Sequence, residues 1–192
     1  MPSASPRATP GLPDLLAQDL KVVFCGLNPG LAAATVGHHF EGRSNRFWRV
    51  LHLSGFTPTL LSPREDARLL EFGYGLTTAV ARATAGAQDL SRQEFVAARS
   101  GLEAKIGRVQ PRFIAFLGKA AYAAMTGQSR IGWGLQPETF GEALAWVLPN
   151  PSGLNRGFSL DALVAAYRDL RQAVDAAPLA NPRTPRMEST PS

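Results

Sequence analysis

The sequence contains a single cysteine, Cys25, and no long apolar run. One thiol cannot close a disulfide within the chain, complete a structural zinc site or hold an iron–sulfur cluster, which needs several thiolates. No stretch approaches the roughly 18 consecutive apolar residues of a membrane-spanning helix, and the N-terminus lacks the apolar core of a signal peptide. These absences predict an intracellular protein with no metal centre and no membrane segment.

Lysine is also scarce, since seventeen of the twenty basic residues are arginine. The net charge is +5 and the pI is about 10.0. Arginine can bind phosphate through two parallel hydrogen bonds and can stack on bases, which suits a polyanionic partner. An arginine-rich, lysine-poor chain with much alanine and glycine can equally reflect a GC-rich genome. Composition alone therefore leaves a nucleic-acid partner open.

A chain of 192 residues, 45% of them hydrophobic, is the size of one globular domain. Residues 1–13 and 177–192 are rich in proline, serine, threonine and alanine and contain few large apolar side chains. This composition predicts flexible tails on both sides of a single domain over residues 14–176.

Short continuous apolar runs predict about four buried strands, at residues 22–25, 75–77, 113–117 and 144–148. Helical patterns lie between and around them, at residues 45–54, 63–72, 91–108, 119–126 and 159–175. This alternation predicts an α/β fold, a three-layer α/β/α sandwich around a mainly parallel sheet. Ligands of such folds bind beyond the carboxyl ends of the strands, so the loops that follow the strands are the first candidates for a site.

Two of these loops have unusual sequences. The first strand is followed by GLNPG at residues 26–30, and the last is followed by PNPSGLNRG at residues 149–157. Asn28 could orient a water or a polar ligand, although asparagine, proline and glycine are also ordinary turn residues. The sequence has no phosphate-binding glycine motif, no Gly-x-Ser-x-Gly elbow and no histidine spacing typical of a metal site. We therefore expect no cofactor.

Three segments together resemble the mismatch-specific uracil-DNA glycosylase family, which includes the thymine-DNA glycosylases. They are GLNPG at residues 26–30, NRFW at residues 45–48 and LPNPSGLNR at residues 148–156. The similarity in order and spacing runs from about Val22 to Tyr167. It implies the uracil-DNA glycosylase fold and a role in DNA base-excision repair. Such an enzyme flips uracil out of duplex DNA, best from a G·U mismatch, and hydrolyses its N-glycosidic bond to leave an abasic site.

The resemblance assigns roles to the first loop and the segment after it. Asn28 would position the attacking water, and an amide can orient water but cannot act as a strong base. Phe40 would stack on the flipped base, although it could also be a core residue. The remaining residues implied to surround the base are Gly26, Leu27, Gly30, Ala33 and Asn150. Asn28 and Asn150 stand where other uracil-DNA glycosylases place an aspartate and a histidine, which predicts a modest turnover rate.

The second loop resembles the family's intercalating wedge. Leu154 would fill the space left by the flipped base, with Gly153, Asn155 and Arg156 near the orphaned partner base. The alternative is that Leu154 packs into the protein's own core. The residues we expect to contact phosphate are Arg43, Arg46 and Ser152, although Arg46 and Arg49 could instead form a solvated helix face.

One further carboxylate, Asp89, could assist the water if its loop folds over the pocket, or could simply cap a turn. Residues 32–34 are all alanine where some relatives carry serines, so a roomy pocket could admit ethenocytosine and other damaged pyrimidines. Asn155 also replaces a serine of some relatives.

No lysine stands near either motif to support a lyase step, which predicts a monofunctional, monomeric glycosylase in the cytoplasm, associated with the nucleoid when bound to DNA. Two alternatives remain: a non-catalytic DNA-damage-binding module on the same fold, and a nucleoside-binding α/β protein.

Overall fold

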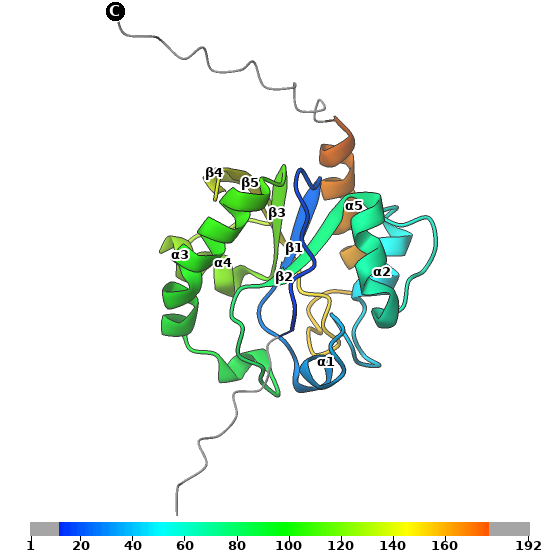
Figure 1. Ribbon diagram of the computed structural model, residues 1–192, viewed down its shortest axis with the longest axis horizontal. Helices are drawn as coiled ribbons and strands as arrows, with labels where there is room; N and C mark the ends of the chain where they lie inside the picture. The colour runs from blue at the N-terminus through cyan, green and yellow to red at the C-terminus, as the bar shows by residue number, and fades with distance from the viewer. Residues whose placement is uncertain (1–11, 177–192) are drawn as a thin grey trace, which may run out of the picture.

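The computed structural model describes residues 12–176, which form a five-stranded sheet with helices on both faces (Figure 1). The strands are β1 (Val22–Gly26), β2 (Tyr74–Thr78), β3 (Phe113–Leu117), β4 (Gly134–Phe140) and β5 (Ala143–Leu148). Their order is β2-β1-β3-β5-β4, and all neighbours are parallel except β4 and β5. The predicted α/β sandwich with a mainly parallel sheet is confirmed.

The helical segments follow the expected pattern with two differences. They are α1 (Leu31–Val36), α2 (Phe47–Leu53), η1 (Pro63–Phe72), η2 (Ala87–Asp89), α3 (Arg92–Val109), α4 (Lys119–Thr126) and α5 (Leu160–Ala176). The segment at 63–72, which we expected to be helical, is a 3₁₀ helix. The Glu65 carboxylate accepts hydrogen bonds from the backbone N–H and the hydroxyl of Ser62 and closes its first turn. The short α1 and η2 were not predicted.

The fifth strand, β4, was also missed from sequence. Only Gln136 and Phe140 of its seven residues are buried, and it contains Pro137, so it lacks the apolar run that marks the other strands. Proline is tolerated there because β4 is an edge strand, and its pairing with β5 is interrupted between Leu135 and Thr139.

Both faces of the sheet are buried, which explains the continuous apolar runs. Successive side chains of a strand point to opposite faces. Val22 and Phe24 accordingly pack in the cluster that contains residues of α2, η1 and α5, whereas Val23 and Cys25 pack in the cluster that contains residues of α3 and α4. Burial raises the pKa of the Cys25 thiol to about 12, so Cys25 is a protonated strand residue.

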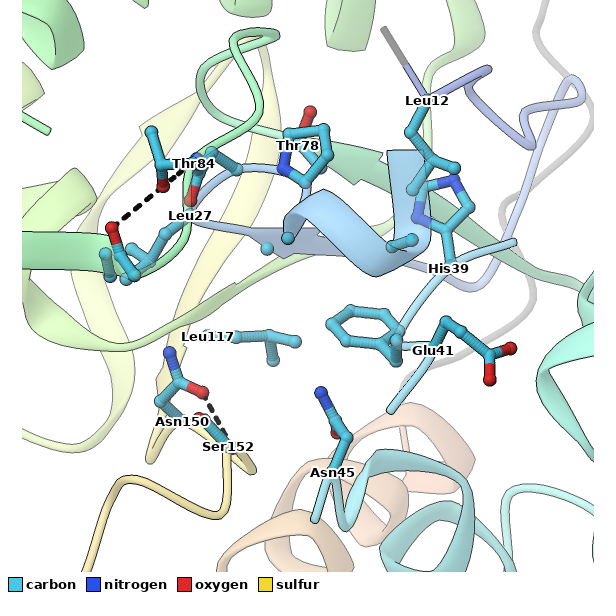
Figure 2. Close-up of a pocket in the computed structure, with 18 of the residues that line it drawn as sticks. Leu12, Leu27, His39, Glu41, Asn45, Thr78, Thr84, Leu117, Asn150 and Ser152 are labelled. Atoms are coloured by element: carbon cyan, nitrogen blue, oxygen red, sulfur yellow. Dashed lines mark hydrogen bonds between the residues drawn. The ribbon is translucent and has the colours of Figure 1, made fainter. Parts of the chain in front are cut away.

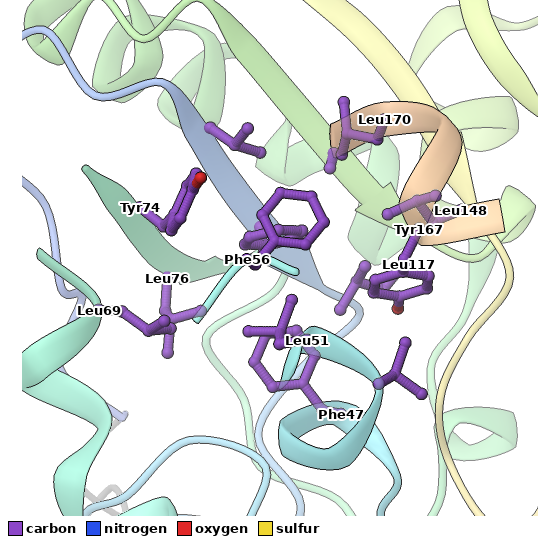
Figure 3. Packing of buried hydrophobic residues seen from close by; sticks show 14 of the residues in the cluster. Phe47, Leu51, Phe56, Leu69, Tyr74, Leu76, Leu117, Leu148, Tyr167 and Leu170 are labelled. Carbon is purple, nitrogen blue, oxygen red and sulfur yellow. The ribbon is translucent and has the colours of Figure 1, made fainter. Parts of the chain in front are cut away.

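Aromatic rings join α2 and α5 to the centre of the sheet (Figure 3). Phe24 meets Phe47 of α2 edge-on at 5.6 Å between ring centroids, and it stacks parallel to Tyr167 of α5 at 6.4 Å. The Tyr167 hydroxyl donates a hydrogen bond to the carbonyl of Pro149 at 3.3 Å. The core thus fixes the start of α2 and the loop after β5, the two segments that carry the second and third sequence motifs.

The segment before β1 is fixed against β2. Leu15 and Leu76 exchange two backbone hydrogen bonds of 2.9 Å, and Gly75 of β2 lies directly beneath this segment. Leu12 and Pro13, which we assigned to the N-terminal tail, therefore have defined positions. The rest of that predicted tail and all of the C-terminal one lie outside the described residues. Across residues 12–176, no helix is long and apolar enough to cross a membrane.

Gly75 provides a test of this packing. A Cβ atom at Gly75 would lie 2.6 Å from Leu20 Cδ1 and 2.8 Å from the Leu15 carbonyl oxygen, so Gly75→Ala should destabilise the protein by about 1–3 kcal/mol through overpacking. Gly101, within α3, has open space around its Cβ position, so Gly101→Ala should instead stabilise by up to about 1 kcal/mol. Urea unfolding measures both, and equal effects would contradict the close approach at Gly75.

Candidate active site

The carboxyl ends of β1, β3 and β5 meet at one edge of the sheet, where loops enclose a cavity of about 170 Å³ (Figure 2). Its walls include residues 26–30, 39–41 and 84–87 together with Asn150, Ser152 and Leu154. Pockets for drug-sized ligands span about 300–1,000 Å³, so this cavity suits a smaller group. All six residues expected to surround the base line it: Gly26, Leu27, Gly30, Ala33, Phe40 and Asn150.

Asn28 lies in this wall with its side-chain orientation fixed. Its Nδ2 donates hydrogen bonds to the carbonyl of Arg82 at 2.8 Å and to the hydroxyl of Thr84 at 2.7 Å. A carbonyl can only accept, so the NH₂ group must face Arg82, and both of its hydrogens are used. Within the described residues the Oδ1 atom has no partner. Asn28 therefore offers the cavity a hydrogen-bond acceptor.

Thr84 holds this arrangement, and sequence reasoning missed it. Its hydroxyl accepts from Asn28 and donates to the Gly86 carbonyl at 2.8 Å, while its backbone N–H binds the Pro29 carbonyl at 3.1 Å. Thr84 is 5% exposed. It lies 56 residues beyond Asn28 in an alanine-rich stretch without a motif, so only the fold brings the two together.

A salt bridge supports the segment that carries Thr84. Arg82 Nε lies 2.7 Å from Glu94 Oε1, and a second guanidinium nitrogen donates to the Asp89 carbonyl. Hydrogen bonds from Arg82 and from the backbone of Ser91 lower the pKa of Glu94 to about 2, so this carboxylate stays ionised near neutral pH. The Arg82 carbonyl, which binds Asn28, is thereby tied to the start of α3.

Phe40 forms an aromatic wall of the cavity. Its ring stacks on Phe47 with centroids 3.8 Å apart and an interplanar angle of 24°. A Cβ atom at Gly26 would touch the same ring at 3.6 Å, so the cavity floor beside Phe40 is a bare backbone. One face of the Phe40 ring thus packs on the core, and the other is available to the cavity. The ring can therefore be a core residue and a stacking surface for a base at the same time.

The segment beside Phe40 is held by His39, a residue the sequence did not single out for the site. Its backbone N–H donates to Asp66 Oδ2 at 2.9 Å, and its Nε2 lies 2.8 Å from the Pro13 carbonyl. Burial lowers the pKa of His39, so the ring is neutral and Nε2 carries the proton toward Pro13. Other cavity residues without a sequence signal include Leu12, Glu41 and Thr78.

Asn150 complements Asn28. Its Oδ1 accepts the backbone N–H of Ser152 at 2.9 Å, which turns its amide nitrogen away from that bond. Within the described residues Nδ2 has no partner, so Asn150 offers two N–H donors. The cavity therefore presents an acceptor from the first loop and donors from the second, a pattern suited to a polar ring with both kinds of group.

Leu154 projects from the second loop and is 75% exposed, which excludes the alternative that it packs in the core. The loop beneath it is rigidly held: Asn155 Nδ2 donates to the Asn150 carbonyl at 2.8 Å, and Gly153 packs against Ser44. A Cβ atom at Gly153 would lie 2.5 Å from the Ser44 carbonyl oxygen, so glycine is required by this close approach. Gly153, Asn155 and the exposed Arg156 flank Leu154 as expected but do not line the cavity.

Arg46, which we expected to contact phosphate, instead supports this loop. Its guanidinium donates hydrogen bonds of 2.7–3.2 Å to four backbone carbonyls, those of Pro151, Ser152, Asn155 and Phe158. Four of its five N–H donors are thereby used inside the protein. Arg43 is exposed, and Ser152 lines the cavity, where its hydroxyl accepts the backbone N–H of Leu154 at 3.3 Å.

Asp89 does not enter the cavity. It is exposed, and its Oδ2 accepts the backbone N–H of Gly86 at 3.1 Å, so it caps its own 3₁₀ turn. Of the two roles considered for Asp89, assisting the water and capping a turn, the structure shows the cap.

The model of the uracil DNA glycosylase superfamily matches residues 13–171, so the chain belongs to that superfamily, whose members are DNA glycosylases. The structure also resembles the solution NMR structure of a candidate uracil DNA glycosylase from Methanosarcina acetivorans, with a TM-score of 0.54 and 17% identity. That likeness covers 85% of this chain and 98% of the other. At this identity it establishes a shared fold.

The role of Arg46 can be tested by Arg46→Lys. An ammonium cannot reach four separated carbonyls, so the variant should lose about 2 kcal/mol of unfolding free energy, at about 1 kcal/mol per hydrogen bond that is not replaced. Arg49→Lys is the matched control: Arg49 lies three residues on, is exposed and makes no hydrogen bond within the described residues, and it should change stability by less than about 0.5 kcal/mol. If urea unfolding gives the same midpoint for both variants, Arg46 does not hold the loop.

Proposed function

We propose that the protein is a monofunctional, mismatch-specific uracil-DNA glycosylase that removes uracil from G·U pairs in duplex DNA and leaves an abasic site. The observation that carries this proposal is the fixed carboxamide of Asn28 in the wall of a small cavity that Phe40 also lines: both amide hydrogens are used, and Oδ1 has no partner within residues 12–176. An acceptor held in this way can bind one hydrogen of a water and direct the oxygen lone pair at C1′ of a flipped nucleotide.

In this mechanism the C1′–N1 bond breaks and the water oxygen bonds to C1′. The bonding electrons leave with the uracil ring, which the donors of Asn150 and nearby backbone N–H groups can stabilise. The water keeps one hydrogen in the new C1′ hydroxyl, and its other proton passes through solvent to the departing uracil anion. Glu41 is the one carboxylate among the described residues that line the cavity, and its carboxylate points away from the cavity (Figure 2). We therefore expect a slow enzyme that depends on its leaving group rather than on a base.

Three further observations support the finer points. Exposed Leu154 on a rigid loop beside the cavity suits a wedge that fills the vacated base stack. No lysine lines the cavity in the part of the chain described, so an imine-forming lyase step has no candidate nucleophile. Ala33 and the bare Gly26 backbone leave room for larger pyrimidine lesions such as ethenocytosine.

The direct test incubates the protein with a G·U duplex labelled on the uracil strand and then treats it with alkali. We expect strand cleavage only after alkali, and a single-turnover rate at least about 100-fold lower for Asn28→Ala. Asp89→Ala, which alters a capping residue outside the cavity, should keep the parental rate within about threefold. Binding without cleavage would favour the damage-binding alternative, and neither binding nor cleavage would favour a nucleoside-binding protein.

Thr84→Val tests how Asn28 is positioned. The substitution keeps the side-chain shape but removes the acceptor of one Asn28 N–H, so the carboxamide can rotate and the water is less well aligned. We expect the single-turnover rate to fall by roughly tenfold while the affinity for an uncleavable duplex changes little. Thr35→Val, which removes a hydroxyl that binds only its own α1 helix, is the control. Equal rates for the two variants would argue against Thr84 as a positioning residue.

A further inference from the structure

A cluster of Trp133, Lys119 and Phe158 lies outside the cavity on the same edge of the sheet. Lys119 opens α4 directly after β3, and Trp133 directly precedes β4, whose first residue Gly134 pairs with Val147 near the carboxyl end of β5. Because β4 runs antiparallel to β5, its beginning lies at the edge where the cavity opens. Gly118 lies next to Asn150, with its Cβ position 3.7 Å from the Asn150 Cβ.

Trp133 is poorly covered for a residue of its size. It is 46% exposed, whereas Trp48 and Trp146 are 6% and 8% exposed. The Lys119 ammonium lies 4.3 Å from the centre of its ring, and Phe158 meets the ring edge-on at 5.3 Å. A cation above an aromatic ring is attracted by the electrons of the ring and keeps its N–H donors.

The hydrogen-bonding capacity of this cluster is unused. Within residues 12–176, Lys119 forms no ion pair and the Trp133 indole N–H has no acceptor. Both groups are donors only, so a ligand that satisfies them must bring acceptor atoms and negative charge. A phosphodiester oxygen meets both requirements.

The cluster is also continuous with the wedge loop. The Phe158 carbonyl accepts a hydrogen bond of 2.7 Å from Arg46, the same side chain that binds the carbonyls on both sides of Leu154. We therefore expect a duplex with Leu154 in its base stack to pass close to Phe158 and Trp133.

We propose, on the basis of the glycosylase function above, that Lys119 and Trp133 bind the DNA sugar–phosphate backbone beside the wedge. They act in binding rather than in bond cleavage. An acidic protein partner would satisfy the same donors, but the shared edge with the wedge loop and cavity favours DNA.

The test measures binding to a duplex with a tetrahydrofuran abasic analogue opposite guanine, which cannot be cleaved. Lys119→Gln should weaken binding about fivefold to tenfold near 0.1 M salt and lower the slope of log K against log salt by about one, as expected for one lost phosphate contact. The single-turnover excision rate at saturating enzyme should stay unchanged. Lys21→Gln is the matched control, because Lys21 also lies over an aromatic ring, that of Tyr74, but before β1 at the opposite edge of the sheet.

Tryptophan fluorescence gives an independent measurement. Because Trp48 and Trp146 are buried, acrylamide quenching reports mainly on Trp133, and the abasic duplex should reduce it; Trp133→Phe should abolish that protection and weaken binding. The proposal is overturned if Lys119→Gln matches Lys21→Gln in affinity and salt slope, or if the duplex leaves quenching unchanged. In those cases uracil excision by the parent protein would persist, which separates this failure from failure of the proposed function.

Discussion

The parallel register of β1, β3 and β5 is the constraint on which the other features of this protein depend. Cys25 lies beside Phe116 and Leu117 lies beside Leu148, so the three strands end at one level. The loop after each strand is thereby brought to the same edge, although their sequence positions are far apart. A shift in any one register would separate Asn28 from Asn150, and the cavity between them would not form.

The polar groups at this edge are arranged by bonds that face away from the cavity. The Arg82 carbonyl and the Thr84 hydroxyl take the hydrogens of Asn28, and the Ser152 N–H takes the oxygen of Asn150. Two chemically identical carboxamides consequently present opposite hydrogen-bonding characters to the space between them. Because their partners already fix both dipoles, neither has to reorient when a polar ligand enters the space between them.

Residues whose chemistry is local could be predicted from the sequence, and residues whose role depends on distant partners could not. Buried strands appear as apolar runs because both faces of the sheet are covered, and the glycine- and asparagine-rich loops after β1 and β5 mark the edge of the site. Thr84 carries no such mark, because its importance arises from Asn28, 56 residues away. Arg46 was taken for a phosphate ligand because a sequence shows a charge but not the four carbonyls that surround it. The edge strand β4 was not predicted because four of its seven residues are exposed, which leaves no continuous apolar run.

The contact between Gly153 and Ser44 ties two loops that are more than a hundred residues apart. Since no Cβ fits at residue 153, the loop that bears Leu154 and the loop that leads into α2 must change shape together. A change in the length or shape of the loop that bears Leu154 would therefore require a matching change in residues 42–46. The two loops therefore form one structural unit, although they lie more than a hundred residues apart in the chain.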